Sequence, residues 1–278
     1  MQSLLFSLPV VGKWLSHRPV LLRVIENISW LSLDKMLRMG VGLFVGVWVA
    51  RYLGPTQYGL WNFAIAFTSL FGAFATLGID EIVVRELVKS PEKAGVFLGT
   101  AFFLRVGGSL IALLLSLLGA VIIGNRDPLT IALIFLSASG FIFQAFLVID
   151  YFYQAHIVSK YTVWAQNASF LFISAIKVIL ILLKAPLLFF ALAGLLEIVM
   201  GSFFLVFSYL FTFHKRNIAH QPSVKEWSFS YEVAKGLLKD SWPLILSSMA
   251  IMIYARIDQV MIKEMLNAEA VGQYAAAV

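Results

Sequence analysis

The stretch that decides the fold is DKMLRMGVGLFVGVWVARYLGPTQYGLWNFA, residues 34–64. It begins as a long apolar segment that carries charges, Asp34 and Arg38 among them, near its start. Gly54 and Pro55 interrupt it, because proline lacks an N–H and disfavours helix in the residue before it. A second apolar segment follows at once. The stretch therefore predicts two membrane helices joined by a tight turn, with charges inside the first helix.

The composition of the whole chain is typical of a membrane protein. Of the 278 residues, 60% are hydrophobic and only 13% are charged, and the mean hydropathy is +0.89. A soluble domain carries about 25% charged residues. The absence of cysteine excludes disulfides and thiol chemistry. We therefore expect an all-α, polytopic membrane protein, in which the net charge of +6 reflects topology and not nucleic-acid binding.

The apolar segments divide the chain into four parts. Seven spans and the start of an eighth are expected, the seven at about residues 28–53, 58–78, 97–123, 129–153, 162–183, 186–213 and 242–266. The parts are a cytoplasmic amphipathic lead-in (1–26), a six-helix lobe (27–213), a cytoplasmic connection (214–241) and a partial second lobe (242–278). The lead-in is a poor signal peptide, because its basic residues follow its apolar run.

The distribution of Lys and Arg predicts the orientation. Twelve lie in the N-terminal segment and in the connections after the second, fourth and sixth spans, against three in the other connections. Because cytoplasmic loops are rich in these residues, the N-terminus is expected in the cytoplasm. Within the long cytoplasmic connection, SYEVAKGLLKDSW (230–242) reads as an amphipathic helix that lies along the membrane.

A faint repeat relates the two ends of the chain. LGPTQYGLWNFA (53–64) aligns with LNAEAVGQYAAA (266–277) at an offset of 213 residues, which places Gly59 on Gly272. The same offset places Ile28 on Ser241, near the start of the seventh span. Two boundaries that share one offset favour a second unit in the same orientation, as in transporters built from parallel repeats. Because the chain stops inside a span, we expect a C-terminally truncated protein whose complete form has twelve to fourteen spans.

Basic residues within spans form the predicted substrate site. Charges inside a membrane are costly and tend to face a polar cavity or a partner helix. Arginine in particular matches the geometry of phosphate. A cationic, substrate-binding cavity is therefore predicted from Arg38, Arg105, Lys177 and Arg256. Asp34 and Arg38, four residues apart, are expected to pair on one helix face.

Three acidic residues within spans have two interpretations. Asp150, Glu197 and Asp258 are either ion-coupling or structural acids. Asp150 is a candidate partner of Arg105, and Glu197 is a candidate for a helix-packing hydrogen bond. The GxxxG pattern of Gly42 and Gly46 predicts close helix packing.

The sequence offers no catalytic constellation. The four histidines are scattered without ligand spacing, so no metal site and no cofactor are expected. A membrane-embedded ligase or glycosyltransferase is an alternative. Such enzymes usually place catalytic residues on a sizeable external loop, and the predicted external connections here are only a few residues long.

Two motifs carry a resemblance to a known family. ARYLGPTQYGLWNFAIAFTSLFGAFATLGIDEIVVREL (50–87) and YARIDQVMIKEMLNAEAVGQYAAA (254–277) resemble the first-to-second and the seventh helix signatures of polysaccharide and O-antigen flippases. These proteins belong to the multidrug/oligosaccharidyl-lipid/polysaccharide (MOP) exporter superfamily, which has two six-helix lobes around a central cavity.

The resemblance implies a transporter and not an enzyme. It implies a bacterial or archaeal protein of the cytoplasmic membrane that moves polyprenyl-diphosphate-linked oligosaccharide to the outer leaflet by alternating access. Its implied partners are the lipid bilayer, the lipid-linked glycan and polysaccharide polymerase or ligase machinery. The runner-up is a drug or cation antiporter of the same superfamily, which would need acidic residues at cavity depth.

Overall fold

The computed structural model describes residues 19–124, 127–215, 218 and 220–277, and this part of the chain is helical and contains no strand. Most of the predicted lead-in, residues 1–18, lies outside the described residues. Residues 19–26 already belong to the first helix, α3 (Pro19–Ser69).

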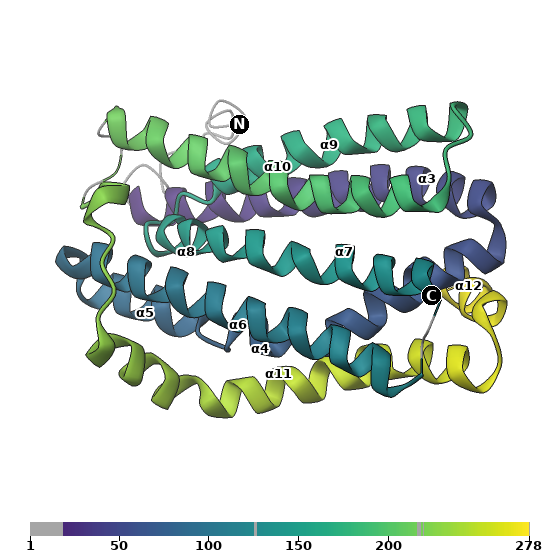
Figure 1. Cartoon of the computed structure of the whole chain (residues 1–278). Coiled ribbons are helices and arrows are strands. Elements are labelled where there is room, and N and C mark those ends of the chain that lie inside the picture. The colour runs from purple at the N-terminus through teal and green to yellow at the C-terminus, as the bar shows by residue number, and fades with distance from the viewer. Residues whose placement is uncertain (1–18, 125–126, 216–217, 219, 278) are drawn as a thin grey trace, which may run out of the picture.

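Helix α3 contains the first predicted span and the start of the second. It is one helix with a kink at Gly54, where φ is 70° and ψ is 170°. This left-handed backbone conformation suits glycine, and Pro55 next to it cannot donate the helical hydrogen bond. Figure 1 shows two limbs of α3 that run in opposite directions from this turn. We call them the first limb (residues 19–53) and the second limb (residues 55–69).

The second limb continues in short pieces toward the other end of the bundle. These are α4 (Gly72–Thr76) and α5 (Asp80–Lys89), where the sequence predicted one span as far as residue 78. The following helices are η1 (Pro91–Lys93), α6 (Ala94–Ile122), α7 (Pro128–Gln144), η2 (Ala145–Leu147), α8 (Val148–Ala155), α9 (Lys160–Leu182) and α10 (Leu187–His214). The chain then passes through η3 (Val224–Glu226) into α11 (Tyr231–Met265) and α12 (Ala268–Ala277).

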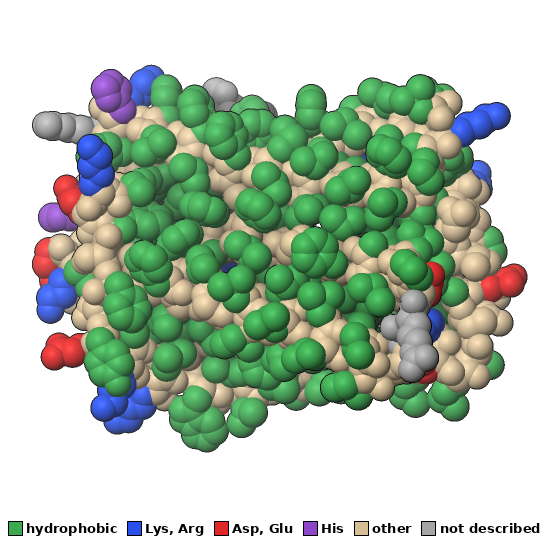
Figure 2. Space-filling model, viewed as in Figure 1, with side chains coloured by type: hydrophobic (Ala, Val, Ile, Leu, Met, Phe, Trp, Pro, Cys, Tyr) green, Lys and Arg blue, Asp and Glu red, His purple; other side chains and the backbone are tan. Residues whose placement is uncertain are grey.

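The helices form an elongated bundle with two distinct ends (Figure 1). We call them the α5 end and the Gly54 end. Six described helices are long and apolar enough to cross a membrane, and the first of them includes the kink at Gly54. Figure 2 shows charged side chains gathered at the two ends of the visible face and apolar side chains over the middle. The chain is therefore a multi-pass membrane protein with an all-α fold.

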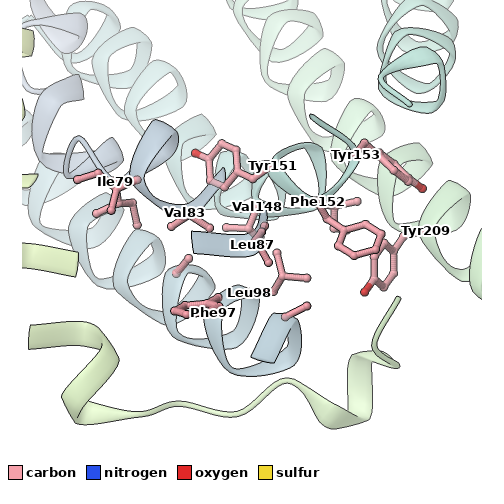
Figure 3. Packing of buried hydrophobic residues seen from close by; sticks show 14 of the residues in the cluster. Ile79, Val83, Leu87, Phe97, Leu98, Val148, Tyr151, Phe152, Tyr153 and Tyr209 are labelled. Carbon is pink, nitrogen blue, oxygen red and sulfur yellow. The ribbon is translucent and has the colours of Figure 1, made fainter. Parts of the chain in front are cut away.

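Two apolar clusters hold the bundle together. One lies toward the α5 end and joins α5, α6, α8 and α10 through residues such as Leu87, Leu98, Phe152 and Tyr209. Figure 3 shows how these side chains meet. The second cluster joins both limbs of α3 to α7, α10 and α12, with Phe63 and Phe190 fully buried in it.

The start of α11 differs from the prediction. The segment 230–242, expected to be a separate helix along the membrane, supplies the first turns of one continuous helix, Tyr231–Met265. Ser230 caps this helix by accepting a hydrogen bond from the backbone N–H of Val233. Pro243 lies inside α11 without ending it. The predicted boundary between connection and span is therefore absent from the structure.

The two ends of the chain meet at the Gly54 end. Helix α12 packs along α3. The break between α11 and α12 falls at residues 266–267, and the kink in α3 falls at residues 53–54, so the two breaks share the offset of 213 residues. The chain thus has a structural repeat at the position where the sequence repeat was found.

Candidate functional site: a groove along the first limb of α3

Two cavities lie beside the first limb of α3, in the half of the bundle nearer Gly54. One, of about 170 Å³, lies between the two limbs and α9. The other, of about 640 Å³, lies between the first limb and α12. Both are lined by Gly42, Gly46 and Tyr58. We call the two cavities together the groove.

Gly42 and Gly46 form the floor of the groove. The sequence predicted that this GxxxG pair packs closely against another helix, and the structure contradicts that. A Cβ at Gly46 would meet no atom within 4 Å, and one at Gly42 would meet only the Cζ atom of Phe170, at 3.9 Å. The missing side chains leave open space. Their role here is to keep the groove wide, with no partner backbone against them.

Lys177 lies on the α9 side of the groove. It lines the smaller cavity, and its Nζ forms an ion pair of 2.9 Å with Glu197 Oε2 of α10. The two side chains are 16% and 24% exposed. Glu197, interpreted from the sequence as a lone acid with a packing hydrogen bond or an ion-coupling role, is thus the partner of a predicted substrate-binding lysine.

Arg38 lies one turn before Gly42 on the first limb. Its Nε donates to Asp34 Oδ1 at 2.9 Å, which confirms the predicted pair. Its guanidinium also lies over the ring of Phe170, 5.2 Å from the centroid. Phe170 and Lys177 are both on α9 and both line the smaller cavity. Lys177 therefore lines the smaller cavity, and Arg38 lies beside it, in contact with Phe170 but outside the lining.

Arg51 lines the larger cavity and was not among the predicted site residues. It is exposed and forms no ion pair with any residue in the described part of the chain. Asn62, on the second limb, adds an amide to the smaller cavity, and its Nδ2 donates to the Tyr58 carbonyl at 2.8 Å. The two charged residues that line the groove, Arg51 and Lys177, are thus both cationic.

Arg105 does not belong to the groove. It is 3% exposed and lies toward the α5 end, where its Nη1 donates to the Tyr151 hydroxyl. The same hydroxyl donates to Asp80 Oδ1, which lies 3.6 Å from Arg105 Nη1. The predicted partner, Asp150, instead accepts from Gln154 Nε2 at 2.7 Å and from the Thr162 hydroxyl. The proposed Arg105–Asp150 pair was therefore wrong.

Arg256 and Asp258 lie on α11 and point to different surroundings, because residues two positions apart on a helix lie on different faces. Arg256 is exposed and pairs with no described residue. Asp258 accepts from the Tyr274 hydroxyl of α12 and from the backbone N–H of Gln259. Asp258 thus joins α11 to α12, and Arg256 is separate from the groove.

A comparison with known families bears on this arrangement. A family model described as "Polysaccharide biosynthesis protein" matches residues 24–278. The chain belongs to the polysaccharide biosynthesis protein family. No curated protein and no solved structure matches the chain. Membership of this family connects the chain to polysaccharide biosynthesis.

Within this polysaccharide biosynthesis protein, sequence reasoning missed Arg51, Tyr58 and Asn62. Arg51 was counted only as a topological charge in a connection. Tyr58 and Asn62 are four residues apart and therefore share a helix face, and an amide inside an apolar helix is itself unusual. That spacing was the available signal. It shows a common face but does not show which helix the face meets.

Proposed function

We propose that the protein is a flippase that moves polyprenyl-diphosphate-linked oligosaccharide across the membrane by alternating access. The observation that carries this proposal is the groove, in which two cavities meet at Gly42, Gly46 and Tyr58 beside basic side chains. Family membership supports the same class of substrate. The proposal makes the protein a transporter with no covalent chemistry of its own.

The charges around the groove suit a diphosphate. Arg38, Arg51 and Lys177 are the basic groups, and Asp34 and Glu197 neutralise two of them. One positive charge, that of Arg51, is left without a partner among the described groups. Phosphate oxygens would bind Arg51 directly and would compete with Glu197 for the ammonium of Lys177. The apolar wall of the larger cavity, formed by Leu43, Val47 and several alanines of α12, would lie along the polyprenyl chain.

The arrangement of α11 and α12 supports alternating access. Both helices pack on α3, and both breaks, at Gly54 and at residues 266–267, lie at one end of the bundle. In the proposed cycle the second repeat unit moves against the first about this shared end. The larger cavity of the groove lies between the two units, at α3 and α12, and would open to one leaflet at a time.

The acidic residues next to the groove favour the flippase over the antiporter alternative. Asp34 and Glu197 are each held in an ion pair, at 2.9 Å, with Arg38 and Lys177. A cation antiporter needs carboxylates available to its ion.

Arg256 of α11, outside the groove, remains a proposed second contact for the substrate.

The proposed location is the cytoplasmic membrane with the N-terminus inside. The excess of Lys and Arg in the connections at the α5 end supports this orientation. Polysaccharide polymerase or ligase machinery would then receive the glycan at the Gly54 end. The bilayer itself is the other partner, through the apolar belt visible in Figure 2.

Deletion and complementation test the proposal. A deletion strain should accumulate lipid-linked oligosaccharide on the inner leaflet, and the full reading frame should restore export. Arg51→Gln and Lys177→Gln should restore it poorly although the protein reaches the membrane in normal amounts. The exposed Lys225→Gln, in η3, is the control and should restore it fully. Normal glycolipid in the deletion strain, with altered drug resistance, would establish the antiporter instead.

A further inference from the structure

A second polar cavity lies toward the α5 end, away from the groove. Its volume is about 410 Å³, and its walls come from α4, α5, α6, α7, η2 and α8. The polar residues that line it are Thr76, Asp80, Glu81, Arg105, Gln144, Asp150, Tyr151 and Gln154. It shares no lining residue with either cavity of the groove. We call it the acidic cavity.

Arg105 of α6 lines this cavity and brings a positive charge to it. The residue is 97% buried, and its Nη1 is engaged by Tyr151 and Asp80. Its Nε has no hydrogen-bond partner. This Nε has less than 1 Å² of accessible surface, so the guanidinium acts on a ligand in the cavity through its charge and not through this N–H. Figure 3 shows the Tyr151 ring at the edge of the apolar cluster, with its hydroxyl pointing away from Val148 and Phe152.

The remaining lining groups are mostly acceptors. Asp80, Glu81 and Asp150 supply carboxylate oxygens, and two glutamines supply amides that both donate and accept. The three carboxylates against one guanidinium give the lining a formal charge of −2 when all are ionised. An anionic ligand would be repelled from such a lining.

We propose that the acidic cavity binds the hydroxyl groups of a neutral or amino sugar in the transported glycan. A sugar hydroxyl donates to a carboxylate and accepts from an amide N–H, so it matches both the acids and the glutamines of the cavity. The volume falls in the range of small-molecule pockets, about 300–1,000 Å³. This inference rests on the proposed function and adds to it the class of sugar that the protein accepts.

A bare cation matches the cavity less well. It would satisfy the carboxylates but would give no acceptor to the amide N–H groups of Gln144 and Gln154, and it would be repelled by the guanidinium of Arg105. Water can occupy the site between transport cycles, because a bridging water gives and accepts hydrogen bonds as a hydroxyl does. The sugar then replaces water without loss of hydrogen bonds.

The two sites divide the substrate by its chemistry. The charged side chains that line the groove nearer Gly54 are basic, and most of those that line the cavity at the α5 end are carboxylates. A lipid-linked glycan has an anionic diphosphate and, beyond it, its sugars. The acidic cavity would therefore discriminate against glycans whose sugar at this position carries a carboxylate.

Saturation-transfer NMR on the purified full chain in lipid nanodiscs tests the proposal. The probes are methyl glucoside, methyl glucosaminide and methyl glucuronide, which differ mainly in charge. Saturation should transfer to the first two and several-fold less to the glucuronide. Asp150→Asn should weaken binding of the first two about tenfold, because charged hydrogen bonds are the stronger ones. The control is Glu92→Gln, an exposed carboxylate in η1 outside the cavity, which should leave binding unchanged.

A second variant distinguishes loss of sugar binding from loss of folding. Gln154→Leu changes an exposed cavity residue and should also weaken binding, with a size-exclusion profile like that of the unaltered protein. Equal or stronger binding of the glucuronide, or undiminished binding by both variants, would overturn the proposal. Absence of any glycoside signal together with a sodium-dependent shift of the protein spectrum would assign the cavity to a cation instead.

Failure of this inference is separable from failure of the flippase proposal. If cells that carry the Asp150→Asn or the Gln154→Leu variant export neutral and acidic glycans at the normal rate, the proposed sugar subsite is wrong and the flippase proposal stands. If the glycosides bind but lipid-linked oligosaccharide moves normally without the protein, the subsite stands and the flippase proposal is wrong.

Discussion

Gly59 and Gly272 pack against each other where the two ends of the chain meet, and each meets the backbone beside the other. A Cβ on Gly59 would collide with the carbonyl oxygen of Ala268, and one on Gly272 would collide with that of Pro55. Gly59 and Gly272 are 213 residues apart in the sequence, and so are Pro55 and Ala268. The contact is therefore reciprocal, as in an interface between two copies of one unit about a two-fold axis.

This reciprocal contact predicts that neither glycine tolerates a side chain. Gly59→Ala and Gly272→Ala should each lower the free energy of unfolding by about 1–3 kcal/mol, because the new methyl group meets backbone that cannot rotate away. Thermal unfolding in detergent measures the effect. Gly236→Ala, in α11, is the control, since a Cβ there meets nothing within 4 Å and alanine stabilises a helix. Equal stability of all three variants would show that α12 does not pack on α3 as described.

The Lys177–Glu197 pair allows a separation of stability from transport. Lys177→Gln alone should destabilise by about 2 kcal/mol, between the values for exposed and buried pairs, because it leaves Glu197 without its partner. The double variant Lys177→Gln with Glu197→Gln should regain most of that stability. If Lys177 contacts the substrate, the double variant stays defective in export. Recovery of export along with stability would make the lysine a structural residue only.

The network at the α5 end predicts which carboxylate neutralises Arg105. Tyr151→Phe should lower the free energy of unfolding by about 1–3 kcal/mol, because the buried guanidinium of Arg105 loses one hydrogen bond. Asp80→Asn should lower it more, because the guanidinium loses the negative charge of its ion-pair partner. Denaturant unfolding followed by tryptophan fluorescence measures both. A large loss for Asp150→Asn with none for Asp80→Asn would restore the pairing that the sequence suggested.

Asp127, at the start of α7, predicts a pH dependence outside the membrane. Hydrogen bonds from the Thr130 hydroxyl and from the N–H groups of Thr130 and Leu129 hold the pKa of Asp127 below its usual value. A lowered pKa gives stability that is fully present above the unfolded-state pKa, about 3.9, and is lost as the pH falls through the folded-state pKa. Asp127→Ala should therefore cost about 1 kcal/mol at pH 7 and less below pH 4.

Unfolding curves at several pH values check this cap. Thr130→Val, which removes the hydroxyl donor and keeps the backbone N–H, should reduce the difference in the free energy of unfolding between pH 7 and pH 2. A cost of Asp127→Ala that is the same at both pH values would show that the carboxylate is not held by these donors.

The membrane class and the breaks of the chain were predictable because each has a local cause. A shortage of charge requires a lipid-facing surface, and Gly54 with Pro55 requires a kink wherever the surrounding helices lie. The extent of α11 was not predictable in this way. Polar residues in SYEVAKGLLKDSW indicate a water-facing face but do not indicate whether the helix ends before the membrane.

The partners of the charges were harder to predict than their positions. Arg105 has acids on two neighbouring helices at the same end of the bundle, and only the rotation of α5 and α8 decides between Asp80 and Asp150. Gly42 and Gly46 have the spacing of a packing motif, yet no described helix approaches Gly46. Pairing that is local in sequence, as between Asp34 and Arg38, was predicted correctly because helix geometry alone determines it.

The leaflet distribution of lipid-linked oligosaccharide tests the central claim most directly. Spheroplasts of the deletion strain, carrying either the unaltered gene or Arg51→Gln, would be treated with a membrane-impermeant glycosidase or lectin, and the accessible fraction of the glycolipid would be measured. If the protein is a flippase, the accessible pool is large with the unaltered protein and small with the variant or with no gene. An accessible pool of the same size in all three strains would contradict the flippase proposal.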